Sequence, residues 1–357
     1  MHAATPAHPF RVVRLDLPLD AATFDGTLRA QPHIALQVHP AAGADAAAWA
    51  ALEQAHLYHV SSARDDLAPH WFVDAAFLRR CPGLLAVTSY GAGYDTVDVA
   101  TCTAAGVLVV NQAGSNAHAV AEHTLGFLLA LSKRIADSDK RLRRGEQYAR
   151  PDGMGHDVEG SVLGLVGIGY IGTRVAQLAR AFGVEVIAHD PLLDADEIRA
   201  RGAAPVSFAD LLRRADAISV HCPLDQSTRG LFGPAQFAAM KDGAIFISTA
   251  RGGIHDETAL HAALVAGKLR GAGLDVWEVE PPAASHPLLA LDKVLASYHN
   301  AGVTVGARKG MATLATAQII DLANDRRPSR LINPEAWERY RARRAAAFGA
   351  TGATAPS

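Results

Sequence analysis

Polar side chains that could bind an anion or move a proton follow apolar, strand-length runs in the second half of the chain. They lie in His221–Pro223, Thr249–Gly253, Leu274–Asp275, Glu278–Glu280 and His299–Gly302. The C-terminal ends of parallel strands meet at one edge of a sheet, so we expect these segments to converge. An arginine there can hold a carboxylate, a histidine can exchange a proton, and an acid can support the histidine. Each residue alone is more often structural, but together they indicate an acid–base site.

A glycine turn within Gly160–Pro191 indicates that a cofactor binds beside this site. Gly167, Gly169 and Gly172 have the spacing G-x-G-x-x-G, after the apolar run 162–166 and before a helical pattern. The first glycine permits the tight turn, the second lets a pyrophosphate approach the backbone, and the third lets the helix pack on the strand. Asp190 ends the next strand and can accept hydrogen bonds from the adenosine ribose while repelling a 2′-phosphate. The stretch therefore predicts NAD as the cofactor.

Composition excludes several other classes of protein. The chain has 357 residues, 49% of them apolar, and a formal net charge of -2, which argues against a nucleic-acid partner. No apolar run is long enough to span a membrane, and the first ten residues lack a signal-peptide core, so we expect a cytoplasmic protein without a membrane partner. The three cysteines have no metal-ligand spacing, so we expect them to be reduced and no metal to be bound.

The elements that must position these groups alternate between strands and helices. In the first half, strands are expected at 11–17, 34–38, 55–60, 84–89 and 107–111, with helices at 74–80 and 97–105. In the second half, strands are expected at 162–166, 184–188, 217–221, 244–248, 271–276 and 294–297, with helices between them and at 307–324. This alternation predicts parallel, doubly wound sheets. The loop Gly91–Gly93 follows one strand end and is a candidate ligand loop.

Residues 116–144 read as one long helix, apolar in its first half and charged in its second. So much apolar surface is more than one domain face usually needs. We therefore expect this helix to lie at a subunit or domain interface.

The chain resembles the D-isomer specific 2-hydroxyacid dehydrogenase family, which includes phosphoglycerate dehydrogenases and glyoxylate/hydroxypyruvate reductases. The matching stretches appear in family order: GAGYDTVD, NAHAVAEHTLGFLLAL, GLVGIGYIG, HCPL, STARGG, GLDVWEVEPP and HNAGVT, between residues 91 and 304. Two departures lie beside the substrate loop, Tyr90 and the run 111–114, so the substrate cannot be inherited from any one branch.

The resemblance implies roles for individual residues. Arg251, Glu280 and His299 are the implied catalytic residues, with Glu280 against the imidazole. The cofactor-binding residues, implied by the turn and the resemblance together, are Gly167, Gly169, Tyr170, Ile171, Gly172, Asp190, His221, Cys222, Pro223, Thr249, Ala250, Arg251, Asp275 and His299. The implied substrate-binding residues are Tyr90, Gly91, Ala92, Gly93, Arg251 and His299.

The expected architecture is α/β, with a flavodoxin-like substrate domain and a Rossmann nucleotide-binding domain separated by a cleft. Residues 1–113 with 305–345 would form the substrate domain, 114–304 the NAD-binding domain, and 346–357 a disordered tail. The expected reaction is hydride transfer between NAD(H) and C2 of a small 2-oxo/2-hydroxy acid, in a homodimer. Two alternatives stay open: an NAD(H)-sensing binding protein like the corepressors of this fold, and a formate dehydrogenase-like enzyme.

Overall fold

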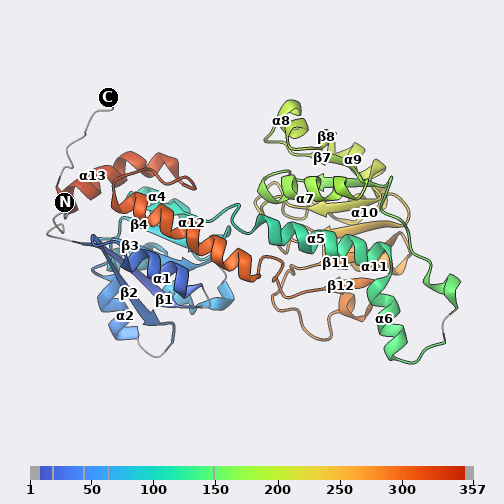
Figure 1. Ribbon diagram of the computed structural model, residues 1–357, viewed down its shortest axis with the longest axis horizontal. Helices are drawn as coiled ribbons and strands as arrows, with labels where there is room; N and C mark the ends of the chain where they lie inside the picture. The colour runs from blue at the N-terminus through green and yellow to red at the C-terminus, as the bar shows by residue number, and fades with distance from the viewer. Residues whose placement is uncertain (1–8, 18–19, 43–44, 63, 148, 350–357) are drawn as a thin grey trace. The chain divides into compact units, whose positions relative to one another are not determined.

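The computed structural model describes residues 9–17, 20–42, 45–62, 64–147 and 149–349. The chain folds as two compact units (Figure 1). Unit 1 comprises the residues up to Asn116 and those from Val305 onward, and unit 2 comprises Ala117–Thr304.

Unit 1 contains a five-stranded sheet in the order β2-β1-β3-β4-β5, and all its strand pairs are parallel. The strands are β1 (Phe10–Asp16), β2 (Ile34–Pro40), β3 (Leu57–Ser61), β4 (Ala86–Tyr90) and β5 (Leu108–Val110). Its helices are α1 (Ala21–Arg29), α2 (Asp45–Leu52), α3 (Ala75–Arg80), α4 (Val99–Ala105), α12 (Val305–Ala323) and α13 (Trp337–Phe348), with short 3₁₀ turns η1 (Arg64–Asp66), η2 (Pro69–Trp71) and η5 (Pro334–Ala336).

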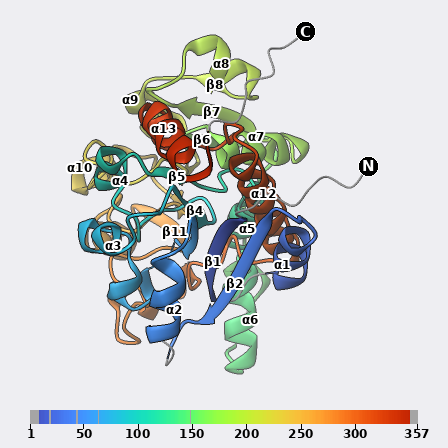
Figure 2. The same cartoon turned by 90° about the vertical axis from the view of Figure 1, so that its left-hand side faces the viewer.

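Alternation along the strands sends side chains to two separate cores in unit 1. Val12 packs with residues of α1, α12 and α13, whereas its neighbour Val13 packs with residues of α2, α3 and α4. Figure 2 shows β1 and β2 side by side, with α12 beside α1. The sheet is therefore covered on both faces, as its continuous apolar strands require.

Unit 2 contains a seven-stranded parallel sheet in the order β12-β11-β10-β9-β6-β7-β8. The strands are β6 (Val162–Val166), β7 (Glu185–His189), β8 (Ala204–Pro205), β9 (Ala217–Val220), β10 (Ala244–Ser248), β11 (Leu269–Leu274) and β12 (Val294–Ala296). Its helices are α5 (Ala117–Ser132), α6 (Ile135–Arg143), α7 (Tyr170–Ala181), α8 (Ala195–Ala200), α9 (Phe208–Arg214), α10 (Pro234–Ala239) and α11 (Glu257–Val265), with 3₁₀ turns η3 (Arg150–Gly153) and η4 (Pro287–Ala290). The expected α/β class with two parallel sheets is confirmed.

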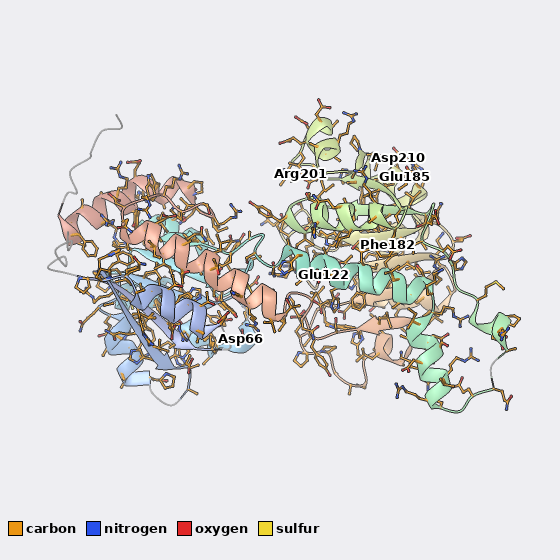
Figure 3. All side chains as sticks on the ribbon, viewed as in Figure 1. Asp66, Glu122, Phe182, Glu185, Arg201 and Asp210 are labelled. Carbon is orange, nitrogen blue, oxygen red and sulfur yellow. The ribbon has the colours of Figure 1, made fainter. Side chains whose placement is uncertain are left out.

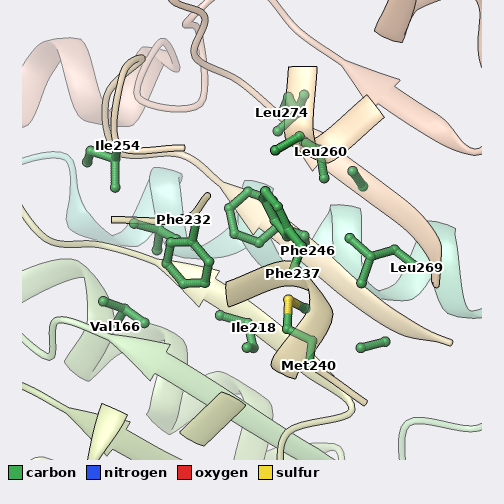
Figure 4. Packing of buried hydrophobic residues seen from close by; sticks show 14 of the residues in the cluster. Val166, Ile218, Phe232, Phe237, Met240, Phe246, Ile254, Leu260, Leu269 and Leu274 are labelled. Atoms are coloured by element: carbon green, nitrogen blue, oxygen red, sulfur yellow. The ribbon is translucent and has the colours of Figure 1, made fainter. Parts of the chain in front are cut away.

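Two apolar layers enclose the sheet of unit 2. Residues of α5, α7 and α8 pack on one face, and residues of α9, α10 and α11 pack on the other. Phe232, Phe237 and Phe246 form the centre of the second layer, with ring centroids 5.0 to 5.9 Å apart (Figure 4). These layers fix the strand ends that carry the polar groups.

The prediction of one long helix at 116–144 is wrong, because the structure contains two helices that are separated at Arg134. Arg134 has a left-handed backbone (φ 54°) and separates α5 from α6. The carbonyl of Ser132 accepts a hydrogen bond from His156 N (2.8 Å), and the guanidinium of Arg134 bonds Asp137 and the carbonyl of Asp152. Two of these partners come from the connector after α6, so the helical periodicity alone did not reveal the break.

Three other segments differ from the sequence-based expectation or lie beyond it. Helix α8 and the short strand β8 follow Asp190 and were not expected. Residues 346–348, assigned to the tail, continue α13 because the Phe348 ring packs against Phe10 and His56. The rest of the expected tail, from 350 onward, lies outside the described residues.

Within the described part of the chain, no helix combines the length and apolar character needed to cross a membrane.

Candidate active site

The glycine turn of unit 2 leaves room for a ligand at only one of its three glycines. A Cβ at Gly167 would lie 2.8 Å from Cys222 N, and one at Gly172 would lie 2.5 Å from the Gly167 carbonyl oxygen. A Cβ at Gly169 would meet no atom within 4 Å. Gly169 is the N-cap of α7 and has no side chain to cap the helix, and the space beside it is open. The turn therefore fits a pyrophosphate, which the N–H groups at a helix N-terminus bind.

Asp190 fastens this turn to the end of β7. Its Oδ2 accepts a hydrogen bond from Ile168 N (3.0 Å), and its Oδ1 accepts one from Leu192 N (3.1 Å). A carboxylate has about four acceptor sites, so ribose hydroxyls can still bind it. Asp190 thus both shapes the turn and presents negative charge beside it.

An arginine from the end of α8 also reaches the glycine turn. Arg201 Nη1 donates to the carbonyl of Ile168 at 2.9 Å, and Figure 3 marks Arg201 at the end of this helix. Arg201 lies 33 residues from Ile168 in the chain. No sequence pattern pointed to this contact, because helix α8 itself was not expected.

Arg251 follows β10, directly after Thr249 and Ala250. Its Nη1 donates to the carbonyl of Ala250 (2.7 Å), and Thr249 Oγ1 lies 3.3 Å from Thr124 Oγ1 of α5. The next residue, Gly252, packs backbone to backbone on the loop after β11, since a Cβ there would lie 1.8 Å from the Trp277 carbonyl oxygen. This contact sets the Arg251 loop against the loop that carries Glu280.

His299 and Glu280 form a hydrogen-bonded pair. His299 Nδ1 lies 2.8 Å from Glu280 Oε2, and Glu280 Oε1 accepts a hydrogen bond from Trp277 N (3.0 Å). Burial of Glu280 opposes its ionisation, but the hydrogen bond and charge of His299, the Trp277 N–H and the charge of Arg251 together hold the pKa of Glu280 below its usual value. An ionised carboxylate only accepts, so Nδ1 carries a proton and Nε2 is left to exchange one with a ligand.

The backbone of His299 adopts an uncommon conformation that Asp275 supports. His299 has φ 52°, a left-handed value that costs energy for a residue with a Cβ. Its N–H donates to the Asp275 carbonyl (2.7 Å), and the buried Asp275 carboxylate accepts from Asn300 N and Ala301 N (both 2.9 Å). The structure therefore shows Asp275, expected as a cofactor contact, bonded to its own chain.

The remaining expected cofactor residues gather around the same end of the sheet of unit 2. His221, Cys222 and Pro223 follow β9, while Tyr170 and Ile171 begin α7, with Tyr170 half exposed. Desolvation lowers the pKa of His221 to about 3, and its Nε2 bonds Ser219 Oγ (2.9 Å). Burial raises the pKa of the Cys222 thiol to about 11, so the thiol stays protonated at neutral pH.

The expected substrate loop lies in unit 1, after β4, and is held by two side chains and one backbone N–H group. Ser89 Oγ donates to Gly93 O (2.6 Å), Asn111 Nδ2 donates to Ala92 O (2.7 Å), and Gln112 N donates to Gly91 O (2.7 Å). All three carbonyls of the loop thus accept hydrogen bonds from other residues of unit 1. The loop N–H groups are the ones a substrate carboxylate would need.

Tyr90 at the start of this loop turns toward α12. Its hydroxyl bonds Arg308, whose guanidinium lies 5.2 Å from the centre of the Tyr90 ring. Burial raises the pKa of Tyr90, although Arg308 opposes the change. Tyr90 is therefore a neutral, fixed side chain.

Sequence reasoning missed three residues that hold the site: Arg201, Trp277 and Ser297. Trp277 Nε1 donates to Ser297 O (3.0 Å), which joins the loops that carry Glu280 and His299. Trp277 stands within the matched stretch GLDVWEVEPP, and Ser297 directly precedes Tyr298 and His299. For Trp277 and Ser297, the nearness in sequence to predicted catalytic residues is a signal that could have indicated them, whereas Arg201 had no such signal.

Comparison with known proteins places this site within a family. Residues 125–301 match the family described as D-isomer specific 2-hydroxyacid dehydrogenase, NAD binding domain. A glyoxylate reductase from Aeropyrum pernix is 36% identical over 269 residues, covering 74% of this chain and 80% of that protein. A D-3-phosphoglycerate dehydrogenase from Archaeoglobus fulgidus is 37% identical over 251 residues, covering 70% of this chain and 47% of that protein.

A solved structure also matches along almost its whole length. The D-lactate dehydrogenase of Aquifex aeolicus, solved in complex with NAD and lactic acid, has a TM-score of 0.76 and 25% identity, covering 90% of this chain and 99% of that one. The chain spans about half the length of the curated phosphoglycerate dehydrogenases that it matches. Unit 2 contains the NAD-binding domain, and the chain belongs to the D-isomer specific 2-hydroxyacid dehydrogenase family.

Proposed function

We propose that this protein is an NAD-dependent dehydrogenase that transfers a hydride between NAD(H) and C2 of a small D-2-hydroxy or 2-oxo acid. The observation that carries the proposal is the 2.8 Å contact between His299 Nδ1 and Glu280 Oε2, beside Arg251 and in the same unit as the glycine turn. A histidine supported by an ionised acid is suited to exchange a proton with a substrate oxygen.

The cofactor would be held by the glycine turn and the strand ends around it. The N–H groups at Gly169, Tyr170 and Ile171 would receive the pyrophosphate, and Asp190 the adenosine ribose. The segments at 221–223 and 249–251, together with Asp275 and His299, would line the nicotinamide end. When bound, NADH supplies the hydride that reaches C2.

The protein's own side chains would supply charge and a proton. Arg251 would hold the substrate carboxylate and polarise the C2 carbonyl, because a guanidinium stays charged and offers parallel donors. His299, charged and donating Nδ1–H to Glu280, would give the proton on Nε2 to the carbonyl oxygen as the hydride arrives. In the oxidation direction the neutral ring would take that proton back.

Unit 1 would contribute the substrate-binding surface. We assign the substrate domain to residues 1–113 and 305–345 and the NAD-binding domain to residues 114–304. The N–H groups of Gly91, Ala92 and Gly93 would bind the substrate carboxylate, since the loop carbonyls already accept hydrogen bonds within unit 1. Tyr90, bonded to Arg308 of α12, would border the loop on the side of that helix.

Spectrophotometric NADH oxidation with a panel of 2-oxo acids tests this function. The panel should contain glyoxylate, hydroxypyruvate and pyruvate, with longer and aromatic 2-oxo acids, because the names of the relatives indicate acids of this class. Turnover of at least one acid, yielding the D-hydroxy acid where the product is chiral, supports the proposal. NADH binding without turnover would favour the nucleotide-sensing protein, and NAD reduction by formate would favour the formate dehydrogenase.

We further propose a homodimer in which α6 lies at the interface. Most of the apolar side chains of α5, including Leu125, Phe127 and Leu128, are buried within unit 2. The exposed apolar residues nearby are Ile135 (58% exposed) and Leu142 (81%) on α6, with Met154 (72%) in the connector. Exposed apolar residues in one region mark an interaction surface better than scattered ones do.

Light scattering tests the dimer. The expected mass is twice the chain mass of 37.5 kDa. Leu142→Glu should shift the protein toward the monomer, whereas Leu192→Glu, which changes an equally exposed leucine (86%) after β7, should not. A wild-type mass of 37.5 kDa at micromolar concentration would contradict the dimer.

We also propose a cytoplasmic location for the protein, and cell fractionation with immunodetection tests it.

A further inference from the structure

A chain of hydrogen bonds joins α5 to the strand end that carries His299. His123 Nε2 of α5 lies 3.1 Å from Ser297 Oγ, and Ser297 Oγ lies 2.6 Å from Asp275 Oδ1. A hydroxyl has one proton, and here it goes to the carboxylate. His123 must therefore present Nε2–H to Ser297, so the chain runs in one direction from the imidazole through the hydroxyl to Asp275.

The acceptor of this chain fixes the backbone around His299. Asp275 Oδ1 also accepts from Asn300 N, and Oδ2 accepts from Ala301 N. The Asp275 carbonyl accepts from His299 N. Three consecutive N–H groups thus end on one buried aspartate, which supports the left-handed backbone of His299.

His123, the first residue of this hydrogen-bond chain, is itself held in place by packing. The His123 ring meets the Phe127 ring edge to face with centroids 4.5 Å apart. Phe127 in turn fills the space beside Gly273 of β11, where a Cβ would lie 2.7 Å from its ring. The residue after His123, Thr124, contacts Thr249 at the strand end that leads to the Arg251 loop. One turn of α5 therefore touches the strand ends that lead to two of the three predicted catalytic residues, Arg251 and His299.

We infer that His123 and Ser297 are positioning residues that act through Asp275 to hold the His299 imidazole in its reactive orientation. This inference rests on the proposed function of His299, because it concerns the same reaction. Neither side chain is needed to fill the core, since both are partly exposed. Their hydrogen bonds, rather than their volume, are what the reaction requires.

Two matched pairs of variants separate the hydrogen bonds from packing. Ser297→Ala removes the hydroxyl and Ser297→Thr keeps it; His123→Leu removes the donor and His123→Gln places an amide N–H near the Nε2 position. Ser297→Ala and His123→Leu should each lower the turnover number for 2-oxo acid reduction roughly 10- to 100-fold, the usual effect of misplacing a catalytic group by about 1 Å. The dissociation constant for NADH, from quenching of protein fluorescence, should stay within about threefold, the scatter expected for a site not contacted directly.

Rescue and non-additivity complete the test. Ser297→Thr and His123→Gln should recover most of the turnover. The double variant that combines Ser297→Ala with His123→Leu should be no worse than the poorer single variant, because both changes break one chain of bonds. Hydrogen–deuterium exchange of the peptide covering 297–304 should be faster in Ser297→Ala and like wild type in Ser297→Thr. This readout does not depend on turnover.

Two results would overturn the inference. One is wild-type turnover in both Ser297→Ala and His123→Leu. The other is loss of NADH affinity together with turnover in all four variants, which would show a role in the fold alone. If wild-type protein reduces no 2-oxo acid, the proposed function fails, and unchanged exchange at 297–304 would then refute the hydrogen-bonded support separately.

Discussion

His299 and Glu280 are 19 residues apart in the chain, yet His299 Nδ1 lies 2.8 Å from Glu280 Oε2. The two residues come from the loops after the neighbouring strands β12 and β11. Trp277 joins these loops, because its backbone N–H donates to Glu280 Oε1 and its indole N–H donates to Ser297 O. The pair is therefore assembled by the sheet edge, and its chemistry depends on the loops keeping their register.

Replacing Glu280 with Gln should move the pH dependence of the reaction. The pKa of Glu280 is below its usual value, so the carboxylate is ionised at neutral pH and its support is lost only as pH falls through that lowered pKa. Reduction should fall and oxidation should rise as pH increases, because reduction consumes a proton at the catalytic site and oxidation releases one. In Glu280→Gln both changes should occur at lower pH, because a neutral amide does not stabilise the imidazolium.

Profiles of kcat/KM against pH for both directions check this expectation. Glu278→Gln is the matched control, since the Glu278 side chain is exposed and its backbone N–H, which the substitution keeps, contacts Glu257. Identical profiles for Glu280→Gln and wild type would show that Glu280 takes no part in the acid–base step.

Asp190→Ala should reduce the preference for NADH over NADPH. The change removes an acceptor for the ribose hydroxyls and the charge that repels a 2′-phosphate, while Arg201 stays bonded to the turn at Ile168. The affinity for NADH should fall roughly 10- to 100-fold, the usual effect of losing hydrogen bonds to a charged group. NADPH binding should change less or improve. Titrations of both cofactors check this, with Asp196→Ala, an exposed acid on α8, as the control.

Gly252→Ala should destroy the site although it changes one hydrogen to a methyl group. The new Cβ would lie 1.8 Å from the carbonyl oxygen of Trp277 and 2.3 Å from its carbon, so the two loops must separate. We expect kcat to fall by about 100-fold or more and the free energy of unfolding to fall by about 1–3 kcal/mol. Gly26→Ala in α1 is the control: its Cβ meets nothing within 4 Å, and it should stabilise the helix by about 0.5–1 kcal/mol. An active Gly252→Ala enzyme would mean that the loops tolerate another register.

Stability should fall in mild acid because several histidines are buried in the neutral form. Desolvation lowers the pKa of His255 to about 4, of His56 to about 4 and of His59 to about 3. The unfolded chain takes up protons at these residues below about pH 6.5, whereas the folded protein does not. The folded state therefore loses stability as pH falls from about 6.5 toward about 4.

Thermal unfolding midpoints across this pH range check that expectation. His255→Leu should weaken the pH dependence of the midpoint, because it removes one of the rings that the unfolded chain protonates. Leucine should break no hydrogen bond there, since neither ring nitrogen of His255 has a partner among the described residues. His156→Leu, which changes an exposed histidine, should leave it as in wild type. A midpoint independent of pH in wild type would contradict the assignment of neutral buried rings.

The elements with local signals were predictable from the sequence. Strands 162–166 and 244–248 have the predicted bounds, because each is a short apolar run ended by a glycine or a polar turn. The steric need for glycine at Gly167 and Gly172 also follows from the spacing alone. The break at Arg134 could not be predicted, since bonds that stabilise it come from residues 152 to 156.

The residues that position the site could not be predicted from the sequence either. Arg201, at the end of the unexpected helix α8, is linked to Ile168 by a contact across 33 residues of the chain. Gly252 meets Trp277 because β10 and β11 are neighbours in the sheet. Such contacts depend on strand order and loop path, which periodicity does not contain. Residues that carry chemistry have distinctive types, whereas residues that position them are recognised by distances.

The most direct test of the proposed function compares wild type with His299→Ala, using the best 2-oxo acid of the panel at saturating NADH. His299 Nε2 should give the proton that completes reduction, so His299→Ala should lower kcat by roughly 10²- to 10⁴-fold, the usual contribution of a positioned general acid. NADH should still bind, as fluorescence titration would show, because the glycine turn and Asp190 are unchanged. Near wild-type kcat in His299→Ala would contradict the proposed mechanism, since the histidine would then take no part in the reaction.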